Sequence, residues 1–220
     1  MIVSFDKKFL FCHLLRTGGT SIKRALKPYS SQPERFMENR ILRALGIRIN
    51  HWTAYERKWF RGHTSAGIAK CNMPSDVWSD LFRFTIVRNP FDRMVSLYHH
   101  LPRHKSGRGV RDLTFHEFVN TWSRRPEFQQ KPLITDENGK LLVDFVGHFE
   151  SLREDFRYIC QKIGLEADLE HANASPRQRD YRDYYTPELI SVVQEVFSDD
   201  LESFGYQFSV PESDGRLNAA

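Results

Sequence analysis

The stretch FLFCHLLRTGGTSIKRAL, residues 9–26, contains the transition that decides the fold prediction. Phe9 to Leu15 form an apolar run that predicts a buried strand, and the apolar spacing of residues 21–26 predicts the start of a helix. Gly18 and Gly19 form the turn between them. A glycine-rich turn from a strand into a helix is an arrangement that binds phosphate groups in many nucleotide-binding proteins.

This turn has the parts of an anion site. Unpaired amides and the positive end of the helix dipole attract negative charge, and glycine lets the backbone approach a ligand closely. The residues that would contact the anion are a charged residue and the small residues after it: Arg16, Thr17, Gly18, Gly19, Thr20 and Ser21. The Gly-Lys-Ser/Thr of a Walker A loop is missing, however, and a lone Gly-Gly-Thr is more typical of a plain helix cap.

A second stretch, FTIVRNPFDRMVSLYHH at residues 84–100, changes this assessment. Arg88 follows an apolar strand and precedes a predicted helix over residues 91–101. Parallel strands deliver their carboxyl ends to one edge of a sheet, so Arg88 is expected near the glycine turn. Arg88 and Ser96, two turns into the helix, would then hold a second phosphate. The alternative is a surface arginine paired with Asp92 and an N-cap serine.

Strands and helices alternate along the rest of the chain. Two further strands are predicted at residues 82–87 and 141–149, and further helices at residues 36–45, 114–122, 151–163 and 187–204. Residues 50–73 have no clear pattern. The alternation predicts an α/β fold with a mainly parallel central sheet, in a single domain over residues 1–210 followed by a flexible tail at residues 211–220.

The 220 residues have the composition of a globular protein, with 40% hydrophobic and 13% aromatic residues. The net charge of +4 suits an anionic ligand but is weak evidence alone, and no basic stripe interleaved with aromatics indicates nucleic acid. The three cysteines include no CxxC pair, which predicts neither a zinc site nor a disulfide framework. Neither a signal peptide nor a membrane span of roughly 20 apolar residues is found, so we expect a soluble, cytoplasmic protein.

Four segments in sequence order resemble the superfamily of sulfotransferases that use 3′-phosphoadenosine 5′-phosphosulfate (PAPS). Residues 13–22, HLLRTGGTSI, resemble its 5′-phosphosulfate loop. Residues 86–98, IVRNPFDRMVSLY, resemble its 3′-phosphate motif closely and are the more specific match. Residues 144–156 and 171–208 extend the likeness to carbohydrate sulfotransferases of the membrane and 2-O types and to their soluble bacterial relatives.

The resemblance implies a P-loop-like, three-layer α/β fold, with helices flanking the sheet and PAPS bound across the strand ends. By this likeness Arg16–Ser21 hold the 5′-phosphosulfate, and Arg88 and Ser96 hold the 3′-phosphate. A loop that often closes over the nucleotide in such enzymes would add Ser175 and Arg177 as secondary contacts.

Arg16 is the main departure from the family pattern. The family usually has lysine at this position, commonly after a proline that is Leu15 here. Arginine keeps the positive charge, but its pKa above 12 makes it a poorer proton donor than lysine. The resemblance therefore assigns Arg16 a catalytic role through charge, as a stabiliser of the leaving phosphate.

Transfer of a sulfonate to a hydroxyl also needs a base for the acceptor proton. The segment WFRGHTSAG, residues 59–67, resembles the Gly-His-x-Ser stretch that supplies a catalytic histidine in uronyl 2-O-sulfotransferases, which assigns the base to His63. An unperturbed imidazole titrates near pH 6.5 and can accept a proton at neutral pH. The alternative is a histidine that only forms a hydrogen bond in a loop. His100 and His104 have metal-ligand spacing but lack a supporting acidic pattern, so no metal is expected.

The implied function is a PAPS-dependent sulfotransferase that moves the sulfonate to a hydroxyl of a carbohydrate or glycan-like acceptor and releases 3′,5′-ADP. Two alternatives stay open. One is a non-catalytic nucleotide- or glycan-binding module of the same fold, which the arginine at position 16 favours. The other is an atypical P-loop small-molecule kinase, against which the missing Gly-Lys-Ser/Thr argues.

Overall fold

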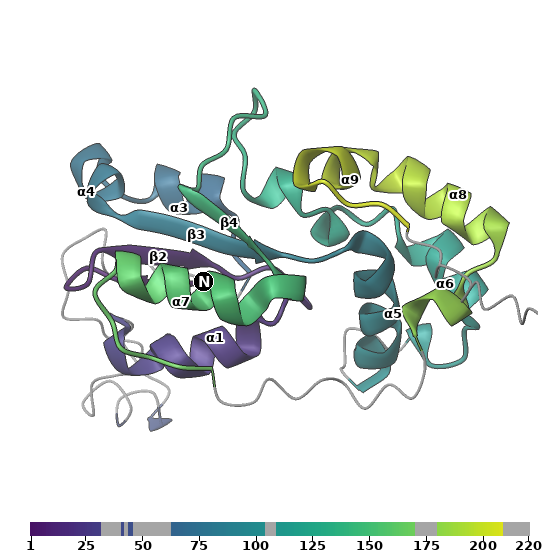
Figure 1. The fold of residues 1–220 in the computed structure, drawn as a ribbon, viewed down its shortest axis with the longest axis horizontal. Coiled ribbons are helices and arrows are strands. Elements are labelled where there is room, and N and C mark those ends of the chain that lie inside the picture. Colours follow the sequence, from purple (N-terminus) through teal and green to yellow (C-terminus); the bar gives the residue numbers. More distant parts are fainter. Residues whose placement is uncertain (32–40, 42–43, 46–62, 104–108, 170–179, 209–220) are drawn as a thin grey trace, which may run out of the picture. The chain divides into compact units, whose positions relative to one another are not determined.

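The computed structural model describes residues 1–31, 41, 44–45, 63–103, 109–169 and 180–208 (Figure 1). Several predicted features fall wholly or largely outside the described residues: the helix over residues 36–45, the tail at 211–220, His104, Ser175 and Arg177. Two compact units make up the chain. The first consists of Met1–Arg88 and Arg125–Pro176, and the second of Asn89–Arg124 and Arg177–Ala220.

The first unit is built on a four-stranded sheet of order β1-β2-β3-β4. Its strands are β1 (Ile2–Ser4), β2 (Phe9–Cys12), β3 (Phe82–Val87) and β4 (Phe145–His148). The strands β2, β3 and β4 run parallel, and β1 pairs antiparallel with β2. The predicted mainly parallel α/β sheet is therefore confirmed. The strand β1 was not predicted, because its three residues are too few to show a period.

The predicted strand over residues 9–15 ends earlier, at Cys12. Cys12 is the last residue of β2 that pairs with β3, opposite Thr85, whose hydroxyl donates to the Cys12 carbonyl at 2.8 Å. Beyond that point the chain leaves the sheet and turns toward the helix. The predicted strand over residues 141–149 is likewise confined to β4.

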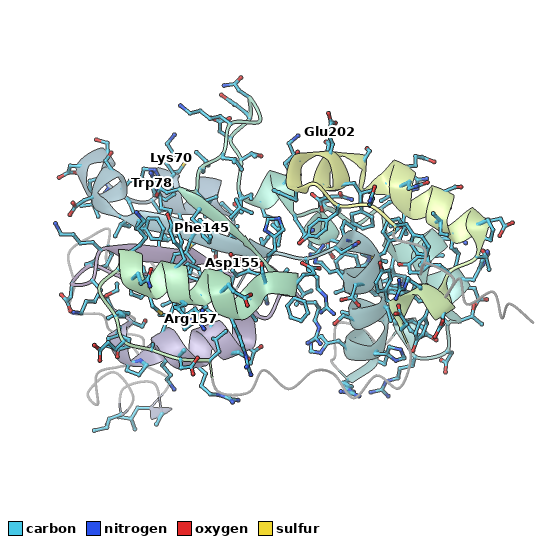
Figure 2. All side chains as sticks on the ribbon, in the orientation of Figure 1. Lys70, Trp78, Phe145, Asp155, Arg157 and Glu202 are labelled. Atoms are coloured by element: carbon cyan, nitrogen blue, oxygen red, sulfur yellow. The ribbon has the colours of Figure 1, made fainter. Side chains whose placement is uncertain are left out.

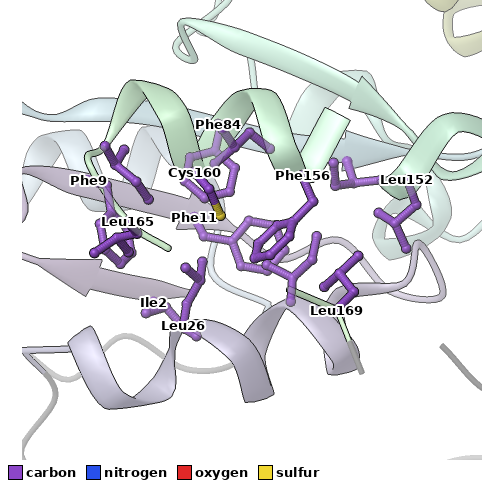
Figure 3. Close-up of a cluster of buried hydrophobic side chains, with 14 residues drawn as sticks. Ile2, Phe9, Phe11, Leu26, Phe84, Leu152, Phe156, Cys160, Leu165 and Leu169 are labelled. Atoms are coloured by element: carbon purple, nitrogen blue, oxygen red, sulfur yellow. The ribbon is translucent and has the colours of Figure 1, made fainter. Parts of the chain in front are cut away.

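Helices α1 (Gly19–Leu26) and α7 (Leu152–Lys162) cover one face of the sheet, and Figure 1 shows α3 (Ala66–Cys71) partly hidden behind β4. Figure 3 shows the apolar cluster under α1 and α7, which combines side chains of β1, β2 and β3 with those of the two helices. Its members include Ile2, Phe9, Phe11, Leu26, Phe84, Leu152, Phe156 and Cys160. The intervening residue Leu10 is also fully buried, as expected for a parallel sheet covered on both faces.

The remaining part of the first unit contains α4 (Ser75–Asp80) and short 3-10 turns. Helix α3 lies within residues 50–73, for which the sequence pattern was unclear, and α4 follows in a segment for which no element was predicted. Both helices are only six residues long, too short for a helical period to be evident. The three cysteines carry free thiols, buried at Cys12 and Cys160 and exposed at Cys71.

The second unit contains α5 (Pro90–His100), α6 (Phe115–Trp122), α8 (Pro187–Val196) and α9 (Ser198–Phe204). Helix α6 begins as predicted, with Thr114 and Glu117 forming a capping box. The predicted single helix over residues 187–204 is wrong, because the chain breaks at Phe197 (φ −110°, ψ 23°) into α8 and α9. Phe197 is fully buried, and the acidic residues just after it favour the start of a new helix.

Candidate active site

The loop from β2 into α1 turns sharply through two residues in the left-handed region, Arg16 (φ 66°) and Gly18 (φ 80°). The buried hydroxyl of Thr17 donates to the carbonyl of Leu14 at 3.2 Å, which tightens the loop. Gly18 is the N-cap of α1 and has no side chain that could occupy the amides of the first helical turn. The predicted strand, glycine turn and helix are thus present in an arrangement that can accept an anion.

Gly18 is closely packed against the side chains of Leu152 and Phe149. A Cβ atom on Gly18 would lie 2.8 Å from Cδ2 of Leu152 and 3.1 Å from Cδ2 of Phe149. Both neighbours come from the junction between β4 and α7. Glycine is therefore required here for two reasons, its positive φ and the lack of room for a side chain.

Gly19 has a different close neighbour, the imidazole of His13. A Cβ atom on Gly19 would lie 1.9 Å from Cδ2 and 2.2 Å from Nε2 of this ring. The missing side chain of Gly19 therefore makes room for His13 at the start of α1. Nothing in the sequence pattern indicated that Gly19 leaves space for the ring of a histidine.

His63 lies next to His13. Its Nδ1 is 3.0 Å from the main-chain carbonyl oxygen of His13, and the two ring centroids are 4.6 Å apart at an interplanar angle of 47°. A carbonyl oxygen can only accept, so the hydrogen bond requires the proton of His63 to be on Nδ1. In the neutral ring Nε2 then carries the lone pair, and the side chain is exposed. His63 is thus held beside the glycine loop with Nε2 as the nitrogen that can accept a proton.

Arg88 follows the last residue of β3 and is 4% exposed. Its Nη1 donates to the carbonyl oxygen of Arg16 at 3.1 Å, and its guanidinium carbon lies 4.0 Å from the centroid of the Phe149 ring. The structure thus brings Arg88 to the glycine loop, as the argument from strand ends predicted. The burial also excludes the alternative of a surface arginine.

Phe149 links these elements, because it contacts both Gly18 and the guanidinium of Arg88. The chain around it is fastened by Asp155 of α7, labelled in Figure 2. One carboxylate oxygen of Asp155 accepts from the amide of His148 at 2.6 Å and from the hydroxyl of Ser151 at 2.8 Å. These bonds hold the short 3-10 turn Phe149–Ser151 that places the aromatic ring.

The other predicted site residues are less closely associated. Thr20 is exposed and Ser21 half-buried, both in the first turn of α1. Ser96 is buried in α5, within the second unit, so its place beside a phosphate stays a prediction. His99 bonds to the hydroxyl of Tyr184 at 2.8 Å. Among the described residues, no group of three or more His, Cys, Asp or Glu side chains could hold a metal ion.

The environment of His13 in the folded protein makes folding stability depend on pH, which can be tested. Burial is the largest of the effects that together lower the pKa of His13 to about 3, and the nearby charges of His63, the N-terminal amine and Lys23 act in the same direction. The unfolded chain takes up a proton on this ring below about pH 6.5, whereas the folded chain does so only near pH 3. The unfolded state therefore binds more protons between these values, and stability falls as the pH is lowered through this window.

We expect the free energy of unfolding to contain a contribution from His13 that falls by about 2 kcal/mol between pH 7 and pH 5. His13→Gln should remove that contribution, which urea unfolding of both proteins at the two pH values will measure. The control is His116→Gln, the same substitution on the exposed surface of α6 outside this site. Equal pH dependence in His13→Gln and the unmodified protein would show that His13 is not the titrating group.

Together, the fold and this site define a class of protein. It is an α/β protein whose glycine-rich loop follows the end of one parallel strand, with an arginine from the next strand end and a histidine held beside it. In the regions that the structure describes, no helix combines the length and the apolar character needed to cross a membrane.

Comparison with known proteins agrees with this class. The model of the Sulfotransferase family matches residues 1–207, nearly the whole chain. The chain therefore belongs to the sulfotransferase family. Its fold is similar to the crystal structure of a sulfotransferase from Alicyclobacillus acidocaldarius, with a TM-score of 0.51 and 18% identity over 89% of this chain and 92% of the other. An uncharacterized protein of Archaeoglobus fulgidus is 36% identical over 90 residues, 40% of this chain and 71% of the relative.

Proposed function

We propose that this sulfotransferase uses PAPS as its sulfonate donor and sulfates a hydroxyl of a carbohydrate or glycan-like acceptor, releasing 3′,5′-ADP. The observation that carries the proposal is the bond from Arg88 to the carbonyl of Arg16 at 3.1 Å. It joins two anion-binding elements, the glycine loop and a buried arginine. A donor with a charged group at each of its 3′ and 5′ positions suits such a pair. The carbohydrate acceptor rests on the resemblance of the segment around His63.

In the proposed reaction, the acceptor oxygen attacks the sulfur of PAPS while His63 takes up the hydroxyl proton on Nε2. The new bond joins the acceptor oxygen to sulfur, and the bond between sulfur and the bridging oxygen of the 5′-phosphate breaks. The electron pair of that bond stays on the phosphate, whose charge Arg16 and the loop amides balance. The resemblance places the 3′-phosphate at Arg88 and Ser96. Most of the acceleration would come from positioning and charge, as in phosphoryl transfer.

Nucleotide binding provides the first test. We expect 3′,5′-ADP at about 100 times its Kd to raise the melting temperature by about 5–10 °C, because ligand binding of that strength stabilises the folded state by about 2.7 kcal/mol. ATP with magnesium, measured in parallel, should give little change. Stabilisation by ATP with magnesium but not by 3′,5′-ADP would favour a kinase and contradict the proposal.

Incubation with labelled PAPS and a panel of glycans and simple alcohols, read by mass spectrometry, then tests transfer. A sulfated product is the expected result. Binding of 3′,5′-ADP without transfer to any acceptor of the panel would instead support the non-catalytic binding module. The variant Arg16→Ala serves as the control that separates transfer by this site from any background reaction.

A further inference from the structure

Gln130 is a buried polar residue that no motif indicated. It is 0% exposed and lies 42 positions from Arg88 in the sequence, within the same unit. Its side-chain Oε1 accepts from the main-chain amide of Arg88 at 3.0 Å, and its Nε2 donates to the main-chain carbonyl of Arg88 at 3.0 Å. The side-chain amide of Gln130 thus forms hydrogen bonds with both main-chain polar groups of Arg88.

The sheet explains why a side-chain amide is needed at this point. Val87, the last residue of β3, pairs with His148, the last residue of β4. On the other side, the pairing of β3 with β2 already ends at Thr85. Arg88 therefore lies beyond the strand pairing on both sides. A carboxamide has one acceptor and a donor, as a peptide group does, so Gln130 replaces the missing strand for this residue.

The side chain of Arg88 is fixed independently. Phe149 lies under the guanidinium, and the carbonyl of Arg16 accepts from Nη1. An arginine side chain has about 2 kcal/mol of rotamer entropy to lose when it binds a ligand. Contacts that already fix the main chain and the guanidinium reduce that loss, which is the physical basis of preorganisation.

We propose that Gln130 is a positioning residue that holds Arg88 for the 3′-phosphate and thereby sets the preference for nucleotides that carry this phosphate. The inference rests on the proposed function. Gln130 acts through the main chain of Arg88 and contacts no substrate itself. A purely structural role would affect all nucleotides alike, whereas the positioning role affects only those with a 3′-phosphate.

The test compares 3′,5′-ADP with 5′-AMP, which lacks the 3′-phosphate, by isothermal titration calorimetry. Gln130→Met keeps the volume of the side chain but removes both hydrogen bonds. We expect its affinity for 3′,5′-ADP to fall about tenfold, the effect of a misplaced hydrogen bond to a charged group, while its affinity for 5′-AMP stays within about twofold. Gln161→Met, the same substitution on the exposed surface of α7, is the matched control and should change neither affinity.

A double-mutant cycle shows whether Gln130 acts on nucleotide binding through Arg88. In an Arg88→Met background, the further change Gln130→Met should no longer alter the ratio of the two affinities. Should Gln130→Met fail to fold, Gln130→Asn keeps an amide but is one methylene too short to reach both groups, and the same loss of preference is expected.

The outcomes separate the two proposals. Equal losses for both nucleotides, or an unchanged preference for 3′,5′-ADP, would overturn the role of Gln130 and leave the proposed function intact. Equal binding of both nucleotides by the unmodified protein would overturn the proposed function itself, and with it the role of Gln130.

Discussion

His63→Ala is expected to lower the rate of sulfonate transfer by about 10²–10⁴-fold, the usual contribution of a general base. The reason is the geometry of this ring: the bond from Nδ1 to the carbonyl of His13 leaves Nε2 as the proton acceptor. Because His63 holds the acceptor proton and not the nucleotide in the proposed mechanism, the affinity for 3′,5′-ADP should stay within about twofold of the unmodified protein. Initial rates with labelled PAPS and calorimetric titration measure the two quantities.

A matched control for this variant is His116→Ala. His116 is an exposed histidine on α6 whose main-chain carbonyl accepts a hydrogen bond from the side-chain amide of Asn120 at 3.0 Å, one turn along the same helix. Its removal should leave the transfer rate unchanged. A full rate in His63→Ala would show that another group takes the proton, while the family membership would stand.

Gly18→Ala is expected to cost about 2–5 kcal/mol of unfolding free energy and to abolish measurable binding of 3′,5′-ADP. The methyl group would occupy a position 2.8 Å from Leu152, and alanine would have to adopt a φ of 80°. The left-handed conformation costs about 1–2 kcal/mol, and overpacking adds about 1–3 kcal/mol. The loop would have to shift to relieve the strained conformation or the close contact. That shift would also move the amides that we propose bind the anion. Urea unfolding and calorimetry measure both effects.

Gly139→Ala separates the two causes. Gly139 has almost the same backbone conformation, with a φ of 78°, but a Cβ atom there would have nothing within 4 Å. This variant should lose only the conformational part, about 1–2 kcal/mol, and should bind 3′,5′-ADP normally. Equal destabilisation by the two substitutions would mean that Leu152 and Phe149 yield to the extra methyl group, so that the packing under Gly18 does not hold the loop.

Local signals account for the parts of the fold that were predicted. Strand β3 was placed correctly because its apolar run stops at a polar Arg-Asn-Pro sequence, and α6 because Thr114 is a residue type that favours a helix N-cap. The break at Phe197 was missed because the apolar spacing continues through it. A buried aromatic residue can interrupt a helix without changing that spacing, and only its packing reveals the interruption.

In the candidate site, too, residues with local sequence signals were predicted, and residues whose roles depend on tertiary packing were missed. Arg88 and His63 were predicted as site residues because their residue types and flanking motifs are suited to bind anions and to accept protons, and the structure brings both to the glycine loop. Gln130, Phe149 and His13 were not, since an amide, an aromatic ring and a loop histidine are compatible with many environments. Their roles depend on partners far away in the sequence, which the strand order brings together.

By itself, the sequence determined that this chain forms a mainly parallel α/β sheet with a glycine-rich turn into a helix after its first parallel strand, because those features depend on residues that are neighbours in the chain. The tertiary structure alone decided how the turn is held. Gly18 lies against Phe149, Gly19 makes room for His13, and Gln130 completes the strand end at Arg88. None of these contacts follows from a periodic spacing of residues, and close packing is what makes them specific.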